Sequence, residues 1–416
     1  MRKKSMFLWS LLAAMTMSAC SEHNELPSGE VPGGNSKANF IVKLNFEGTS
    51  MEQGGKTRAA QSTAVPETSW SIRQVQILLY DASNIVRFSD VVTPTAGNTT
   101  FTYTDVPAGT YTMVAIANAK SSADAINTYL DGGTTPVEWG MWNVRQKQVQ
   151  NMVMKYKTGT FPAFCSAALA GNTAYTEPAE IFMGAVSNVV ISSDATATPS
   201  PIALKREVSL MRVRLNVKDK EGNTNNENTA KGVDFTQDAS IMIYRLPDYL
   251  KVMAGNDGGV SATSTATNIL SISDGEVFKT AEPGAGYNPG GMILNGNFTM
   301  WRDVVVFPNN GGRVNDSATT GTADRQRQYF IVVSGRGKAG HILGDGTALP
   351  SDATVYWSGV VKENFVPNVI REVNLTLRTG GSTTVPVTPT EYGGLTITVG
   401  APTPWDSNIV NSDIIM

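Results

Sequence analysis

Apolar residues at every second position recur along this chain and constrain its fold more than any other feature. In the first such segment, the apolar residues are Phe40, Val42, Leu44 and Phe46. Successive side chains of a β-strand point to opposite faces, so this spacing predicts a strand with one face in a core. Comparable segments follow at short intervals as far as residue 377. The sequence therefore predicts an all-β protein.

The predicted strands fall into two groups, one on each side of residue 204. The chain has 416 residues, enough for two domains with sizeable cores. We therefore predict two tandem β-sandwich domains, over residues 59–203 and 204–380. Helical spacing is limited to short insertions near residues 122–131 and 141–156.

The N-terminus has the organisation of an export signal. Three basic residues at positions 2–4 precede the apolar run 6–17, which is too short to span a bilayer permanently. Small residues then lead to Cys20, in a pattern that resembles a lipobox. We predict that residues 1–20 are a lipoprotein signal peptide, that Cys20 carries lipid, and that the precursor is held at a membrane by this lipid. The alternative is an ordinary secretory signal that ends in cysteine.

Two polar segments flank the first predicted strand. Residues 21–37 have no apolar periodicity and are typical of a flexible tether. Residues 48–66 form a polar segment that contains Arg58 and Ala59 and is unusually long for a compact domain. The second cysteine of the chain, Cys165, lies among apolar residues, so we predict a buried thiol and no disulfide framework.

The composition excludes several classes of function. The chain contains two histidines, His23 and His341, so no catalytic triad or multi-histidine metal site can be assembled. The net charge is −3, and no basic run follows the signal peptide, which argues against nucleic-acid binding. Tryptophans are scattered rather than clustered and are read as core residues. We predict a non-enzymatic protein without a metal or other cofactor.

The C-terminus is unusually apolar. A polar, proline-bearing spacer occupies residues 381–390, and residues 395–416 follow it. The apolar positions of this last segment are Leu395, Ile397, Val399, Ile409, Val410, Ile414 and Ile415. An apolar chain end of this kind needs a partner to cover it.

Several of these segments together resemble the fimbrillins of Bacteroidales, the FimA-like and Mfa-like subunits of type V pili. The resemblance extends over nearly the whole chain. It rests on the lipobox, on the order of the strands, on the terminal strand, and on the motifs at residues 106–118, 181–184, 204–214, 306–309 and 368–375.

The resemblance implies a fold and an assembly mechanism. Such subunits consist of two tandem transthyretin-like β-sandwiches and reach the outer membrane as lipoproteins. A trypsin-like protease cuts after an arginine and removes the lipid with the first strand, which opens a groove. The C-terminal segment of an identical or related subunit then fills this groove, and the mature protein lies outside the cell in adhesive fimbriae.

The assembly mechanism maps onto particular residues of this chain. It implies a cut between Arg58 and Ala59, a propeptide over residues 21–58, and a removable strand at Phe40 to Phe46. The donated strand would lie in residues 395–416, behind the spacer. An arginine site favours a shaft or tip subunit over an anchor that keeps its lipid, and the apolar tail favours a shaft subunit.

Alternatives stay open for each assignment. Arg58 can be an ordinary arginine of a polar loop, and residues 395–416 can pair within their own domain. The alternative function is that of a monomeric glycan-binding lipoprotein serving polysaccharide uptake, which would keep its lipid and expose a face of aromatic residues.

Overall fold

The computed structural model describes residues 37–46, 74–94, 98–118, 126–130, 134–137, 145–217, 232–252, 267–273, 275–279, 300–309, 328–363, 365–388 and 393–404. Almost all regular structure in these ranges is β-strand, which confirms the predicted all-β class. No helix in the ranges is long and apolar enough to cross a membrane.

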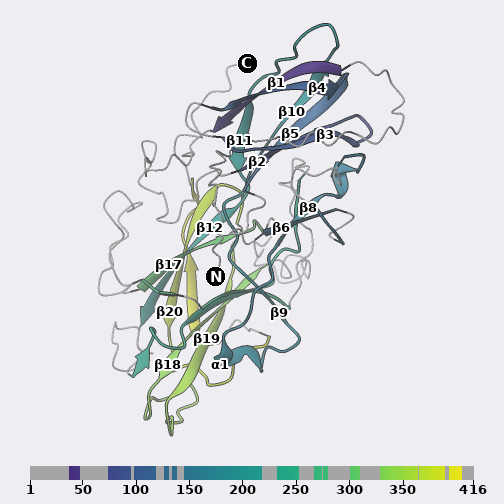
Figure 1. Ribbon diagram of the computed structural model, residues 1–416. Helices are drawn as coiled ribbons and strands as arrows, with labels where there is room; N and C mark the ends of the chain where they lie inside the picture. Colours follow the sequence, from purple (N-terminus) through teal and green to yellow (C-terminus); the bar gives the residue numbers. More distant parts are fainter. Residues whose placement is uncertain are drawn as a thin grey trace, which may run out of the picture. The chain divides into compact units, whose positions relative to one another are not determined.

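The first group of strands forms a seven-stranded arrangement that folds into a sandwich (Figure 1). Its strands, in order of pairing, are β3 (Val86–Val92), β2 (Val75–Tyr80), β5 (Gly109–Ala117), β10 (Phe182–Ile191), β11 (Ile202–Arg206), β1 (Lys37–Phe46) and β4 (Thr100–Pro107). Side chains from all seven strands share one apolar core. Strands β3 and β4, at the two ends of this order, meet across the core. The rings of Phe88 on β3 and Tyr103 on β4 contact each other edge to face, with their centres 4.8 Å apart.

The second group of strands forms most of two further sheets. One sheet has the order β17 (Met300–Val306), β12 (Ser209–Val217), β20 (Val369–Leu377) and β21 (Leu395–Val399), with β22 (Thr403–Pro404) also paired to β20. The other has the order β13 (Val233–Asp234), β18 (Tyr329–Gly337), β14 (Ser240–Tyr244), β16 (Asn268–Ile272) and β9 (Thr173–Tyr175), with β19 (Ala353–Val361) paired to β18. Both sheets contribute to one core that includes Trp357, which is completely buried.

The outer face of the β14–β18–β19 sheet is also covered. The short helix α1 (Ala163–Ser166) places Cys165 against this face, together with Leu169 and Val385. Cys165 is buried, as predicted, and burial raises the pKa of its thiol to about 11.

The two predicted helical insertions are wrong. Within 122–131, the structure has strand β6 (Ile126–Leu130), and within 141–156 it has the 3-10 turn Val149–Asn151 followed by strand β8 (Val153–Tyr156). These strands form a small sheet in the order β15 (Leu250–Lys251), β8, β6 and β7 (Thr135–Pro136). Apolar residues at 149, 152, 153 and 156 have helical spacing because a tight turn precedes a buried strand, not because the segment is helical.

Strands from the two halves of the sequence interlock. Strand β9 pairs with β16, and β8 pairs with β15. The first pairing ties β9, from before position 204, into a sheet built mainly from residues after it, and the second ties β15, from after it, into a sheet built mainly from residues before it. The predicted domain boundary at 203/204 falls inside β11, and the division into domains 59–203 and 204–380 stays a prediction.

A buried polar cluster fastens the end of β11 to the start of β20. The Arg206 Nε donates to the Glu180 carboxylate at 2.7 Å, and both side chains are almost completely buried. A second guanidinium nitrogen donates to Asn368 Oδ1 at 2.7 Å, just before β20. The guanidinium also lies over the ring of Phe182, 4.9 Å from its centre. We call these four residues the Arg206 junction.

The Arg206 junction gives a first prediction. Arg206→Met leaves the Glu180 carboxylate buried without this cationic partner, so we expect the free energy of unfolding to fall by about 3–5 kcal/mol. Urea unfolding of the full chain measures the change. The control is Lys338→Met, because the Lys338–Asp352 pair at 3.1 Å is largely exposed. Equal midpoints for Arg206→Met and Lys338→Met would contradict the role given to the junction.

Candidate functional site: the first strand and its groove

Strand β1 is an interior strand of the first sandwich (Figure 1). It pairs antiparallel with β4 on one side and parallel with β11 on the other. Ile41 N–H donates to the Ala197 carbonyl at 2.9 Å, and Leu44 N–H donates to the Thr99 carbonyl at 2.9 Å. The first strand of the described chain therefore supplies hydrogen bonds to two neighbours.

The apolar face of β1 points into the core. Phe40 and Val42 are completely buried, Leu44 is 4% exposed, and Ala38 is 3% exposed. Asn39, Lys43 and Asn45 are exposed, as alternation requires. The sequence pattern predicted three of the inward residues but missed Ala38, which continues the same period of two. The Phe46 backbone pairs with Leu204, and its side chain lies outside the described ones.

Each inward residue of β1 has a neighbour on an adjacent strand that points to the same face. The paired residues are Ala38 with Val106, Phe40 with Tyr103 and Ala197, Val42 with Phe101, and Leu44 with Ile202. The rings of Phe40 and Tyr103 are stacked with their centres 6.3 Å apart. Along β1, the inward side chains are a small one (Ala38), an aromatic one (Phe40), a β-branched one (Val42) and a leucine (Leu44). They occupy four successive side-chain sites.

Removal of β1 would leave a groove between β4 and β11. Both neighbours would lose their hydrogen-bond partners along this edge. The three large inward side chains contribute roughly 1.5–3 kcal/mol each through burial. Because β1 is the first described strand, a cut after it separates it from the rest of the chain without breaking any other strand. The groove can thus receive an extended segment through backbone pairing and alternate side chains.

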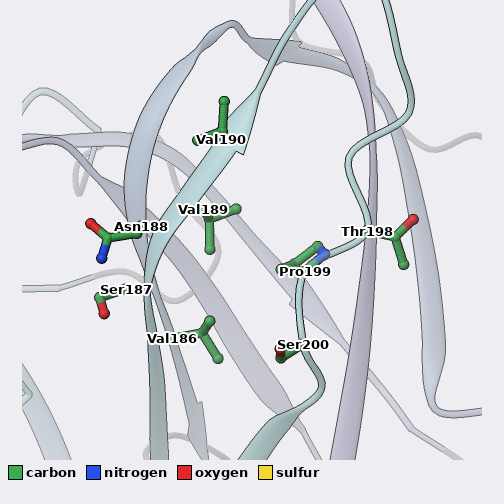
Figure 2. A pocket seen from close by; sticks show the side chains of 8 residues that line it. All are labelled: Val186, Ser187, Asn188, Val189, Val190, Thr198, Pro199 and Ser200. Carbon is green, nitrogen blue, oxygen red and sulfur yellow. The ribbon is translucent and has the colours of Figure 1, made fainter.

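A shallow pocket lies beside this region (Figure 2). It has a volume of about 330 Å³ and lies between a bulge of β10 and the segment before β11. Its lining residues are Val186, Ser187, Asn188, Val189, Val190, Thr198, Pro199 and Ser200. None of these side chains is charged, so the pocket brings no acid–base pair together.

The start of the C-terminal segment has a place in its own domain. Strand β21 pairs antiparallel with β20, and β22 pairs with the first residues of β20. Leu395 is 7% exposed and belongs to the core, and Ile397 and Val399 pack against it. The expectation that residues 395–404 lack a partner within the chain is therefore corrected, and in this structure they adopt the alternative of pairing within their own domain.

The spacer before β21 is attached as well. Ser382 exchanges backbone hydrogen bonds with Tyr356 on β19, at 2.8 and 3.0 Å. The buried His341 Nε2–H donates to the Gly380 carbonyl at 2.8 Å, and Tyr244 Oη–H donates to the Pro386 carbonyl at 2.9 Å. Its composition predicted a polar spacer, and contacts with residues distant in the sequence left no periodic signal in it.

Two glycines, Gly393 and Gly394, lie between the spacer and β21 and allow the chain to pass close to its neighbours there. Gly394 has φ +83°, and a Cβ on Gly393 would lie 1.8 Å from Ser358 Oγ. Only glycine fits both positions without strain or displacement.

The other predicted site residues lie outside the described residues. They are Cys20, Arg58, Ala59, Ile409, Val410, Ile414 and Ile415. Among the described residues, no group of three or more His, Cys, Asp or Glu side chains could hold a metal ion. Trp301 and Trp357 are buried in the core.

A family model described as "Fimbrillin-A associated anchor proteins Mfa1 and Mfa2" matches residues 28–346. This match covers well over half of the chain. The chain belongs to this family. It is therefore a member of a fimbrial subunit family, as the sequence motifs indicated.

Solved structures similar to this family member include a fimbrilin (FimA) from Porphyromonas gingivalis W83. It is 15% identical, with a TM-score of 0.44, over 89% of this chain and 98% of that chain. A "putative cell adhesion protein" from Bacteroides eggerthii DSM 20697 is 14% identical, with a TM-score of 0.47, over 90% of this chain and 98% of that chain. No curated protein matches the chain.

The buried face of β1 gives a second prediction. Phe40→Ala should lower the free energy of unfolding by about 3–5 kcal/mol, because it empties a buried aromatic site. Chemical denaturation of the uncut chain measures the effect. Lys43→Ala, on the exposed face of the same strand, is the matched control and should leave the midpoint unchanged. If the two variants unfold alike, β1 does not contribute to the core as described.

Proposed function

We propose that this protein is a structural subunit of a cell-surface fimbria that polymerises by strand exchange and supports adhesion. The precursor is exported as a lipoprotein through Cys20 and is cut between Arg58 and Ala59 by a trypsin-like protease. The cut separates β1 and the lipid from the rest of the chain. The C-terminal segment of an identical or related subunit then fills the groove.

The observation that carries this proposal is the position of β1. It is first in the described chain but interior in its sheet, with a buried face and two hydrogen-bonded neighbours. Arg58 lies downstream of β1 in the sequence and upstream of β2. One cut there separates the occupant of the groove from every strand that forms the groove.

The arrangement of the tail supports the second half of the proposal. In the described part of the chain, β21 is an edge strand of its sheet and pairs with β20 alone. Its residues Leu395, Ile397 and Val399 alternate with exposed threonines, as an inserted strand requires. A strand at the end of a sheet can leave without breaking the pairing of any two other strands.

Family membership also bears on the role of the subunit. The description of the matching family model names anchor proteins. An anchor that kept β1 and its lipid would not open its own groove, whereas a shaft or tip subunit would. We favour a shaft role, because the chain has both a separable first strand and an apolar tail.

Within the described ranges, no observation favours the glycan-binding alternative. That function calls for an exposed aromatic platform, and the tryptophans in the described ranges, Trp301 and Trp357, are buried in the core. A monomeric lipoprotein of this kind would also stay monomeric after cleavage at Arg58.

A third prediction concerns anchoring. Cys20→Ser should abolish incorporation of a labelled fatty acid, because the thiol accepts the diacylglycerol. Cys165→Ser is the matched control and should keep the label, since it changes the chain's second cysteine. Equal labelling of both variants would exclude Cys20 as the lipidated residue.

A fourth prediction concerns maturation and assembly. Arg58→Ala should leave β1 in place and prevent polymerisation by an arginine-specific protease, as seen by negative-stain microscopy. Lys56→Ala is the control in the same segment and should polymerise normally. Filaments from wild-type protein should begin at Ala59. Recovery of Phe40 to Phe46 within washed filaments would refute the removal of β1.

Deletion of residues 395–416 tests the donor segment in the same assay. The truncated chain, cut after Arg58, should form no filaments, and its thermal unfolding shows whether the domains remain folded. A folded, truncated protein that builds filaments of normal length would place the donor strand elsewhere.

A further inference from the structure

One edge of β10 is open in the described part of the chain. On one side, β10 pairs with β5 as far as Ile191, but on the other side it pairs with β11 only at Phe182 and Met183. Beyond these two residues, β11 turns away to pair with β1, and no described strand takes its place beside β10. Residues 184–191 therefore present backbone groups that a further strand can pair with.

This open edge carries no charge. Strand edges that must stay unpaired usually carry charged side chains, prolines or bulges. Strand β10 has the sequence FMGAVSNVVI, without a charged residue or a proline, and of these devices it has only a bulge between Val186 and Val189. Val190 is 63% exposed, more than any other large apolar side chain in the described ranges. An uncharged edge with an exposed aliphatic side chain suits the binding of another strand.

The pocket beside the groove lies along this edge (Figure 2). Three valines of β10 line it on one side, and residues 198–200 line it on the other. Hydroxyl and amide groups, from Ser187, Asn188, Thr198 and Ser200, lie among these aliphatic groups. The lining therefore matches a strand in which aliphatic and short hydroxyl side chains alternate.

The segment that faces β10 across the pocket also borders the groove. Ala197 N–H donates to the Asn39 carbonyl at 3.0 Å, and the Ala197 carbonyl accepts from Ile41 N–H at 2.9 Å. The next three residues of the same segment line the pocket. The pocket and the groove thus share one wall, and this segment separates an occupant of the pocket from β1.

The start of the tail has the composition that the pocket matches. Strand β21, Leu395–Val399, has the sequence LTITV, in which aliphatic residues alternate with threonines and no residue is charged. In the described part of the chain it pairs with β20 alone. In the proposed exchange, this segment has to reach the groove of another subunit while β1 still fills that groove.

We propose, on the basis of the strand exchange proposed above, that the open edge of β10 and its pocket form a docking site for the tail of an incoming subunit. The tail pairs with β10 before β1 leaves. Docking raises the local concentration of the tail beside the groove, so the tail enters the groove faster once β1 is released. The site accelerates assembly and is not part of the final strand-filled groove.

A binding experiment on the uncut full chain isolates this site, because β1 remains in the groove. The probe is a fluorescent peptide of residues 393–401, and anisotropy measures its binding. We expect saturable binding that Val190→Asp weakens at least roughly tenfold, because the docked strand would cover the new carboxylate. Ile342→Asp is the matched control, since Ile342 is 51% exposed and lies in a different loop. Both variants should keep the urea midpoint of the wild type.

Variants of the peptide test how it is held. Methylation of alternate backbone nitrogens should abolish binding, because it removes the hydrogen bonds to β10. Equal affinity of the methylated and native peptides would overturn the proposal. Saturable binding of maltoheptaose that displaces the peptide would assign the pocket to a neutral glycan and would overturn it as well.

Assembly kinetics separate the docking site from strand exchange itself. After cleavage at Arg58, the Val190→Asp protein should polymerise roughly tenfold more slowly than the wild type but reach the same final filament length. Ile342→Asp should polymerise at the wild-type rate. A wild-type rate for Val190→Asp would overturn the docking site and leave strand exchange standing. If the peptide binds as expected but cleaved wild-type protein forms no filaments, the docking surface stands and the proposed function fails.

Discussion

The two-sided backbone pairing of β1 is the interaction on which the first sandwich depends. A strand with one neighbour could be lost with little effect on the rest of a sheet. Strand β1 instead satisfies hydrogen bonds of both β4 and β11 and closes the core with Phe40 and Val42. Under the proposed mechanism, removal of β1 would leave unpaired backbone groups on both neighbours and an empty apolar site, which a replacement strand could fill.

The strands next to the groove are linked to those next to the tail. Strand β11 borders β1, and its last residue, Arg206, is held by Glu180 and bonds to Asn368 at the start of β20. Strand β20 in turn carries β21 and β22. A pull applied to a strand in the groove would therefore pass through a buried ion pair and continuous β-pairing to the tail. In the proposed filament, this path would carry tension from one subunit to the next.

The sequence predicted the fold class and the core face of β1 because a period of two is a local signal. It misassigned residues 149–156, where a tight turn before a buried strand imitates helical spacing. It also missed the docking of the spacer, since the bonds from His341 and Tyr244 join positions far apart in the chain. Tertiary contacts of this kind leave no pattern in the segment that receives them. The same limit explains why the start of the apolar tail looked unpartnered, whereas β21 and β22 pair with β20.

In the proposed strand exchange, the tail would leave its own sheet and enter the groove of another subunit. In its own domain, β21 pairs on one side only within the described chain, and Ile397 and Val399 are only partly buried. In the groove, the same strand would have β4 and β11 as neighbours and would bury its inward side chains completely. The proposed transfer would therefore gain hydrogen bonds and apolar burial. Gly394, at φ +83°, can leave this left-handed conformation for an extended strand without steric cost.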